Sequence, residues 1–454
     1  MTSGIGIVRI SGPEAFCIAD RIFRFGDARK SAAALPANTV HYGHVCSDSE
    51  KREIIDEALL IIFKAPHSYT AEDTVEIDCH GGPYIISRIL KACVDAGARL
   101  AEPGEFTKLA FLNGRIDLAR AEAVMDVVNA ASGEALKAAE NQLSGRLSQK
   151  VSSIRSLILN ETAFIEAAAD DPEHYSLDGY MDELREKCQK AENELRALSA
   201  SFEEGRVVRE GVPAALLGKP NAGKSSILNL LSGSDRAIVT DVPGTTRDVL
   251  EETLSVGGLT LRLFDTAGIR QSDDEVERIG IKRARESAEN ASLLLLVFDG
   301  SRPLTEEDRE LVSLSKGKNA ICLVNKADLP QAFTAEELAG LFGGDADGKP
   351  SIIAFSAKTS EGKDELSEKI RRLYLKGAIL GTGEAMITNA RHREAVDAAA
   401  EALSNAVGTI DAGFPEDLLT VDLMDAYNSL GLITGDTAGE DLVNEIFSKF
   451  CMGK

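Results

Sequence analysis

The residues from Gly218 to Ser225 read Gly-Lys-Pro-Asn-Ala-Gly-Lys-Ser, which is the spacing of a phosphate-binding loop. An apolar run, Ala214 to Leu217, precedes the loop, and aliphatic residues at helical spacing follow it. In a strand, loop and helix of this kind, backbone N–H groups of the loop and of the helix N-terminus point at phosphate oxygens. Lys224 would place a positive charge near the β- and γ-phosphates, and the Ser225 hydroxyl would bind Mg²⁺. The predicted phosphate-side residues are Asn221, Ala222, Gly223, Lys224, Ser225 and Ser226.

Three further motifs follow predicted strands in the order that a GTP-binding domain requires. The first is D-T-A-G, whose carboxylate would hold Mg²⁺ through water while its glycine N–H meets the γ-phosphate. The second and third, N-K-A-D and S-A-K, would form the pocket for the base. Their residues are Asp265, Thr266, Ala267 and Gly268, then Asn325, Lys326 and Asp328, then Ser356, Ala357 and Lys358.

The carboxylate of Asp328 would select guanine. It can accept from guanine N1–H and N2–H₂ together, whereas adenine has no donors there and would leave the carboxylate unpaired. Such a mismatch is worth roughly 10⁴-fold in affinity. The stem of Lys326 can lie over the base. Together the motifs predict a GTP-binding domain of the Ras-like class.

The residue that would orient the attacking water is left open by the spacing. Ile269 stands where Ras-type enzymes place a glutamine. Nearby carboxylates and cations offer several alternatives, and a solvated charge run is the default interpretation. The candidates are Asp273, Asp274, Glu275 and Glu277, with Arg247 and Arg270 as cations.

The pattern of apolar residues predicts an α/β protein combined with an all-α part. Residues 1–114 are expected to form an α/β domain, with strands Ile5–Ile10, Ala58–Phe63 and Thr74–Ile77. His80-Gly-Gly-Pro83 could be a ligand loop, but turn chemistry favours a tight turn that opens the next helix, Tyr84–Ala96.

Helical spacing dominates residues 115–206, including a helix expected at Met181–Glu203, and it returns at 374–454. Residues 207–373 alternate strand and helix, which predicts a mostly parallel, doubly wound sheet inserted into one helical domain. The strands expected there are Ala214–Leu217, Leu259–Phe264, Leu293–Phe298, Ala320–Val324 and Ser351–Phe355.

Composition limits the classes of function. The 454 residues carry a net charge of −23, the wrong sign for a protein that grips nucleic acid by itself, so any RNA role needs a local basic patch or a basic partner. Seven scattered cysteines without a C-x-x-C pair argue for a reducing cytosol and against zinc. No run approaches the length of a membrane span, and no signal peptide is evident, so we expect a cytoplasmic protein.

Three stretches give the chain a resemblance to a known family. Gly244-Thr-Thr-Arg-Asp248, Asp265-Thr-Ala-Gly-Ile-Arg270 with its acidic continuation, and the terminal Phe450-Cys-Met-Gly-Lys454 resemble the MnmE (TrmE) family of bacterial tRNA modification GTPases. The resemblance covers essentially the whole chain. It implies a folate-binding N-terminal domain that dimerises, a helical domain made from two chain segments, and an inserted G domain.

The resemblance also implies an activity and its partners. Family members hydrolyse GTP with potassium stimulation and work with an FAD-dependent partner, MnmG, in a heterotetramer or larger complex. They modify C5 of the wobble uridine, position 34, of certain tRNAs to an aminomethyl-type or carboxymethylaminomethyl-type group. The one-carbon unit comes from 5-formyl- or methylene-tetrahydrofolate, and the tRNA would be held mostly by the partner.

Individual roles follow from the same resemblance. The first switch would contact GTP, with Thr246 and Ser225 on Mg²⁺, and K⁺ would be held by Asn221, Thr240, Val242 and Thr245. Glu277 matches the glutamate that orients water, and Arg247, Asp248 and Arg270 would act in pairing of the switches. The full first-switch set is Thr240, Asp241, Val242, Pro243, Gly244, Thr245 and Thr246.

For folate, the matching positions are Arg9, Glu76, Arg115 and Lys454. Arg115 stands where some members have lysine. From the residues alone, Arg9 and Glu76 are equally well interpreted as a surface ion pair. Cys451 matches a cysteine proposed to matter for tRNA modification, although a lone cysteine near a C-terminus is otherwise usually inert.

The chain departs from the family pattern at two places, its N-terminus and the residue after Cys451. Only Met1-Thr-Ser precedes Gly4, where the family usually has a further strand, so we expect a truncated or shifted start. Met452 replaces a common isoleucine, a volume-conserving change.

The alternatives to the tRNA function are a ribosome-assembly switch of the Era or Der kind, which would need a basic RNA-binding module, and a folate-dependent methyltransferase with a regulatory G domain.

Overall fold

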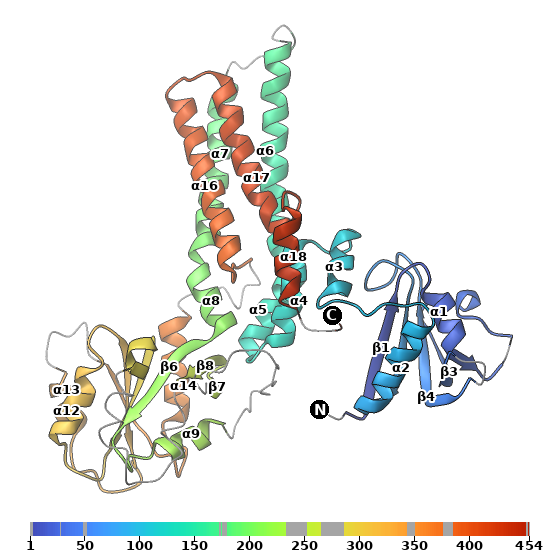
Figure 1. Cartoon of the computed structure of the whole chain (residues 1–454). Coiled ribbons are helices and arrows are strands. Elements are labelled where there is room, and N and C mark those ends of the chain that lie inside the picture. The colour runs from blue at the N-terminus through green and yellow to red at the C-terminus, as the bar shows by residue number, and fades with distance from the viewer. Residues whose placement is uncertain are drawn as a thin grey trace. The chain divides into compact units, whose positions relative to one another are not determined.

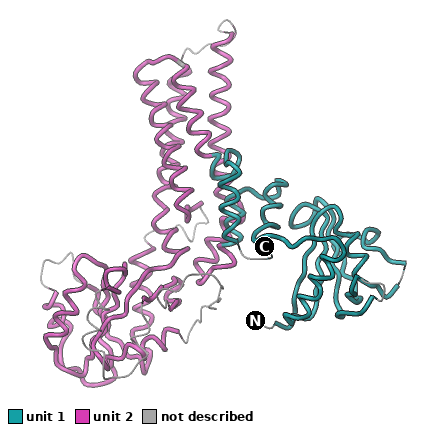
Figure 2. The backbone as a smooth tube through the Cα atoms, in the orientation of Figure 1, with its two compact units in different colours: residues 1–125, 431–454 teal, residues 126–430 magenta. Residues whose placement is uncertain are grey.

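The computed structural model describes residues 3–27, 29–48, 52–171, 174, 179–232, 252–264, 286–342, 350–375, 385–450 and 453. By their contacts, these residues divide into two compact units, one of residues 1–125 with 431–454 and the other of residues 126–430 (Figure 2). Each unit is described by itself below.

The first unit contains a five-stranded antiparallel sheet in the order β1-β5-β4-β3-β2 (Figure 1). The predicted strands and the predicted helix are confirmed, and the loop before that helix is a turn, since Pro83 is the first residue of α2. Strands β2 and β3 and the helices α1 and α3 were missed. The elements are β1 (Ile5–Ser11), α1 (Ala15–Ile22), β2 (Phe23–Phe25), a 3₁₀ turn η1 (Ala32–Ala34), β3 (Thr39–Cys46), β4 (Ile54–Phe63), β5 (Thr74–His80), α2 (Pro83–Asp95) and α3 (Glu105–Leu112).

One face of this sheet is buried and the other is exposed. One face packs its alternate residues, such as Val8, Ile77 and Leu60, into a core with α1 and α2. The other face leaves large apolar side chains exposed, and the strand register aligns them in neighbouring rows, Ile7 beside Asp78, Leu59 and Tyr42. An apolar sheet face that stays in water is unusual for a monomer and marks an interaction surface. We call the side chains of Ile5, Ile7, Val40, Tyr42 and Leu59 the outer sheet face.

The C-terminal segment completes the first unit. Helix α18 (Glu440–Ser448) packs Val443 and Phe447 against α3 and the start of α4 (Leu118–Asn129). Phe447 stacks between Phe111 and Phe450, with ring centroids 6.2 and 5.0 Å apart. The chain end that carries the terminal Phe-Cys-Met-Gly-Lys motif is thereby anchored, through Phe450, to the N-terminal part of the chain.

The second unit contains a helical bundle built from segments on both sides of the G domain (Figure 1). Helix α7 runs antiparallel to α16, because Arg185 pairs with Asp411 at 2.6 Å and Ser199 bonds Asp397 near the opposite ends. This confirms a helical domain drawn from two chain segments. The helices of this unit outside the G domain are α5 (Gly133–Leu143), α6 (Arg146–Asp170), α7 (Tyr180–Ala200), α8 (Phe202–Glu210), α16 (Ala390–Asp411) and α17 (Glu416–Thr434).

The predicted helix Met181–Glu203 is wrong at its C-terminal end. Helix α7 ends at Ala200, and a new helix, α8, begins at Phe202 after a turn at Ser201. The returning chain fixes this turn, because the backbone N–H of Ile387 donates to Ser201 Oγ at 3.1 Å. Gly205 on α8 also lies against Ile387, whose carbonyl oxygen would collide with an added Cβ. The chain therefore enters and leaves the G domain side by side.

The G domain is a six-stranded, doubly wound sheet in the order β11-β10-β9-β6-β8-β7. All five predicted strands are confirmed and pair in parallel, while β7, which was missed, pairs antiparallel with β8 in a hairpin. Helices α9 and α14 cover one face and α12 and α13 the other. The elements are β6 (Val212–Gly218), α9 (Lys224–Ser232), β7 (Glu252–Val256), β8 (Leu259–Leu263), β9 (Leu293–Asp299), α12 (Glu306–Ser313), β10 (Asn319–Asn325), α13 (Ala335–Gly340), β11 (Ser351–Ala354) and α14 (Lys363–Tyr374).

Candidate functional site

The predicted phosphate loop connects β6 to α9 at the carboxyl edge of the parallel sheet. Two of its residues need the backbone freedom of a tight loop. Gly223 has φ +97°, and Asn221 adopts a left-handed φ of +62°. Gly218 at the strand end packs so closely on β9 that an added Cβ would lie 2.5 Å from the Val297 carbonyl oxygen. The loop thus has the strand–loop–helix context that the sequence predicted.

Lys224 lies inside the turn of this loop. Its Nζ donates to the carbonyl oxygens of Gly218 and Lys219, at 2.6 and 2.8 Å. Burial lowers the pKa of Lys224 because no described carboxylate pairs with the ammonium. A polyanion beside the ammonium would compensate for this desolvation, which is the electrostatic requirement of a phosphate site.

The side chain of Asn325 joins the phosphate loop to the predicted base loop. Its Nδ2 donates to the Ala222 carbonyl oxygen at 2.8 Å, and its Oδ1 accepts from the Ala357 backbone N–H at 3.2 Å. The residue is 3% exposed, so both bonds are shielded from water. Gly223 has to lack a side chain for this reason also, since an added Cβ would collide with Asn325 Nδ2. Three of the predicted motifs are thereby held in one piece.

Asp328 is oriented by Ser356. Ser356 is fully buried, and its Oγ donates to Asp328 Oδ1 at 2.7 Å while accepting from the Thr359 backbone N–H at 3.2 Å. Asp328 itself is exposed at the sheet edge, next to the Asn325 bridge. A fixed carboxylate in this position can accept two parallel N–H bonds from one edge of a planar base.

Many predicted site residues lie outside the described residues. They belong to the first switch, the D-T-A-G motif, the segment of the water-orienting candidates and the terminal motif. These residues are Thr240, Asp241, Val242, Pro243, Gly244, Thr245, Thr246, Arg247, Asp248, Asp265, Thr266, Ala267, Gly268, Arg270, Glu277, Cys451 and Lys454.

A second polar cluster lies in the first unit. Arg9 on β1 pairs with Glu76 on β5 at 2.7 Å, directly across the strand register. The guanidinium groups of Arg9 and Arg115 both lie over the ring of Tyr69, each 5.1 Å from its centroid. The structure thus brings together three of the four predicted folate residues; Lys454 is outside the described residues.

Sequence reasoning missed the aromatic part of this cluster. Phe106 also lies under Arg9, 5.3 Å from its guanidinium carbon, and the Tyr69 hydroxyl is 2.8 Å from Thr107 Oγ1. Phe106 and Thr107 belong to the E-P-G-E-F-T stretch, a polar landmark in the sequence, but Tyr69 lies in a Ser-Tyr-Thr turn with no periodic signal. Two cations gathered on one aromatic ring, with a carboxylate beside them, can pair with the polar edge of a flat heterocycle.

Neither a membrane-spanning helix nor a cluster of metal-binding side chains occurs among the described residues. No described helix is long and apolar enough to cross a membrane. Within the same residues, no group of three or more His, Cys, Asp or Glu side chains is arranged to hold a metal ion.

Comparisons with known proteins match this architecture over the whole chain. The family description "GTP-binding protein TrmE N-terminus" matches residues 1–115, and "MnmE helical domain" matches residues 118–451. A protein of Lachnoclostridium phytofermentans named tRNA modification GTPase MnmE is 46% identical over 452 residues, covering 100% of this chain and 97% of that protein. Proteins with the same name from Acetivibrio thermocellus and Geobacillus thermodenitrificans are 43% and 44% identical, each covering 99% of this chain and 96% of the relative. With family matches at both ends and relatives aligned across the full length, the chain belongs to the MnmE family of tRNA modification GTPases.

Proposed function

We propose that this protein hydrolyses GTP and that the hydrolysis drives the modification of wobble uridines in tRNA. The observation that carries the proposal is the fixed pair of Asp328 and Ser356 on the same sheet edge as the phosphate loop, joined to it by Asn325. A carboxylate held there accepts the two donors of guanine, and the loop and Lys224 accept the phosphates. Ser225 with Thr246 would hold Mg²⁺.

Replacing Asp328 by asparagine should change base selectivity. The carboxamide turns an N–H toward guanine donors, so GTP affinity should fall by about a hundredfold or more, whereas xanthosine triphosphate, which has a carbonyl at C2, should gain affinity. Calorimetric titrations with GTP, xanthosine triphosphate and ATP measure this. Glu336→Gln, which removes an exposed carboxylate on α13, is the matched control. ATP binding as tight as GTP binding, or an unaltered preference in Asp328→Asn, would exclude the proposed base pocket.

We further propose that a potassium ion beside the phosphates supplies positive charge during hydrolysis, where other GTPases use an arginine. Support comes from Asn221, whose left-handed backbone keeps it at the exposed tip of the loop. Thr240, Val242 and Thr245 would complete the site, and Glu277 would orient the attacking water. The charge would stabilise the developing negative charge of the transition state.

The potassium site predicts a salt-specific rate. GTP turnover should be severalfold faster in KCl than in NaCl at equal ionic strength, because a site sized for K⁺ discriminates by ion and a screening effect does not. Asn221→Ala should abolish the difference, while Asn229→Ala, which changes an exposed asparagine on α9 of the same domain, should retain it. Equal rates of the unmodified protein in the two salts would remove potassium from the proposal.

We propose that the N-terminal domain forms a homodimer through the outer sheet face and binds a tetrahydrofolate derivative at the Arg9–Glu76 cluster. Five large apolar side chains exposed on one sheet face support the dimer, since a second copy would bury them. Tyr69 holds the guanidinium groups of Arg9 and Arg115 over its ring, near Glu76, and this supports the folate site because a pterin ring is polar at its edge. Lys454 would contribute a further cation.

A charge on the outer sheet face should separate the dimer. Ile7→Glu places a carboxylate among apolar side chains and beside Asp78, so a dimer seen by sedimentation should become a monomer. Leu112→Glu is the matched control, since Leu112 is 61% exposed and Ile7 60%, but Leu112 lies on α3. A dimer that survives in Ile7→Glu would show that the copies meet elsewhere.

The tRNA chemistry is proposed to require the FAD-dependent partner MnmG. The net charge of −23 supports this, since so acidic a chain needs a more basic partner to hold RNA. The folate one-carbon unit would be built into a C5 aminomethyl-type group on the uridine at position 34, and Cys451 would serve this step.

Nucleoside mass spectrometry of tRNA tests this function. A deletion strain should lack the C5 substituent on wobble uridines, and the intact chain should restore it whereas Lys224→Ala should not, because the loop lysine is needed to hold the triphosphate. Removal of the flavoprotein should abolish restoration. Unchanged wobble uridines in the deletion strain would favour the ribosome-assembly switch, and modification without the flavoprotein would favour the methyltransferase alternative.

A further inference from the structure

Asp299 is a buried carboxylate that none of the predicted motifs contains. It is the last residue of β9, the strand between the phosphate-loop strand β6 and the base-loop strand β10, and it is 7% exposed. A carboxylate this deeply buried is costly unless cations and hydrogen bonds compensate for lost water. The partners of Asp299 therefore show which interactions stabilise its buried charge.

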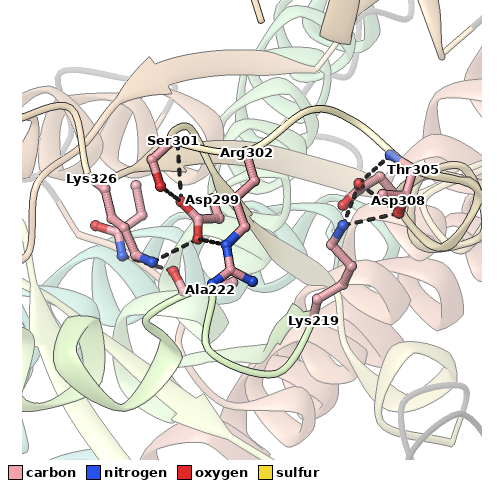
Figure 3. A network of polar contacts seen from close by, with 9 residues as sticks. Lys219, Ala222, Asp299, Ser301, Arg302, Thr305, Asp308 and Lys326 are labelled. Atoms are coloured by element: carbon pink, nitrogen blue, oxygen red, sulfur yellow. Dashed lines mark hydrogen bonds and ion pairs between the residues drawn. The ribbon is translucent and has the colours of Figure 1, made fainter. Parts of the chain in front are cut away.

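The partners of Asp299 are the base loop and its own turn (Figure 3). Oδ2 accepts from Lys326 Nζ at 2.6 Å, and Oδ1 accepts from the Ser301 hydroxyl at 2.6 Å and the Ser301 backbone N–H at 3.1 Å. Arg302, which is mostly exposed, adds a longer ion pair at 3.6 Å. Burial by itself would raise the pKa of Asp299, but the bonds from Lys326 and Ser301 hold it below its ordinary value. The carboxylate thus stays ionised throughout the neutral range.

Lys326 is held at both ends. Its backbone has a left-handed φ of +65°, and its carbonyl oxygen accepts from Gln331 Nε2 at 3.1 Å. The neighbouring Asn325 carbonyl oxygen accepts from the Gly300 N–H at 2.9 Å, next to Asp299. With the ammonium fixed on Asp299 and the backbone fixed in the loop, the aliphatic stem between them has few rotamers left.

The ion pair of Lys219 with Asp308 has the same length as the pair of Lys326 with Asp299, but it has a purely structural explanation. Lys219 Nζ bonds Asp308 Oδ2 at 2.6 Å, but Asp308 is also the third residue of α12 and part of its capping box, since it accepts from the backbone N–H of the N-cap residue Thr305 at 2.8 Å (Figure 3). Helix capping accounts for a buried Asp308 without any ligand. Asp299 caps no described helix, and the nearer of its two described charge partners, Lys326, belongs to the Asn-Lys-Ala-Asp motif.

We propose that Asp299 is a positioning residue for base recognition. It holds the Lys326 ammonium so that the lysine stem remains extended as one wall of the guanine site, with Asp328 at the edge of the base. The inference rests on the proposed GTP site. Because the wall is on the base side and away from the γ-phosphate, Asp299 contributes equally to GTP and GDP binding and not to the chemical step.

The test is equilibrium binding and steady-state kinetics on the full-length chain. Asp299→Asn is isosteric and should weaken GTP and GDP binding about tenfold each, as expected for loss of one charge-assisted hydrogen bond, with kcat at saturating GTP within about twofold. Asp126→Asn is the matched control: it breaks the 2.7 Å pair with Arg209, and the Asp126 side chain is 12% exposed, but Asp126 lies on α4, outside the nucleotide sheet. The control should leave both affinities unchanged.

A double-mutant cycle separates positioning from structural damage. Lys326→Met keeps the apolar stem and removes the ammonium, so adding Asp299→Asn to it should cause no further loss of affinity. Losses that multiply in the double variant, or unchanged affinity in Asp299→Asn, would overturn the inference. The unmodified protein serves as a separate check: if it binds neither guanine nucleotide, the proposed function fails at that step, before Asp299 is tested.

Discussion

The amide of Asn325 is the interaction on which the nucleotide site depends. Its Nδ2 donates to the Ala222 carbonyl oxygen of the phosphate loop, and its Oδ1 accepts from the Ala357 N–H of the base loop. The residue is almost wholly buried. A carboxamide is suited to this task, because it holds a donor group and an acceptor group at a fixed separation. The amide thereby joins three loops, of which the phosphate loop is more than a hundred residues from the other two in sequence, and these contacts fix the position of the nearby Asp328 carboxylate.

The parallel sheet supplies the frame for that group. Strands β6, β9 and β10 are buried on both faces, and all of them end at the same edge. Such strands appear in sequence as nearly continuous apolar runs, and this is why these three were predictable. The loops that follow them also have fixed short-range spacing, so the motifs of the phosphate and base loops could be read without a structure.

What could not be predicted depends on contacts between distant residues. Strand β7 is a hairpin partner with polar residues at alternate positions, and it gives no long apolar run. The break between α7 and α8 is set by Ile387, nearly two hundred residues away, bonding to Ser201. Tyr69 gains its neighbours Arg9 and Arg115 only when the sheet has formed, and the Asp299–Lys326 pair exists only because β9 and β10 are adjacent.

The side-by-side entry and exit of the G domain has a mechanical consequence. A domain joined to its neighbour by one chain segment can rotate in any direction. A domain joined by two adjacent segments has a defined hinge axis that passes through both. Ile387 lies against Ser201 and Gly205, just before the chain reaches β6 at Val212. The two connections therefore oppose twisting of the G domain relative to the helical domain. The softest motion left is a hinge rotation about the line that joins the two connections.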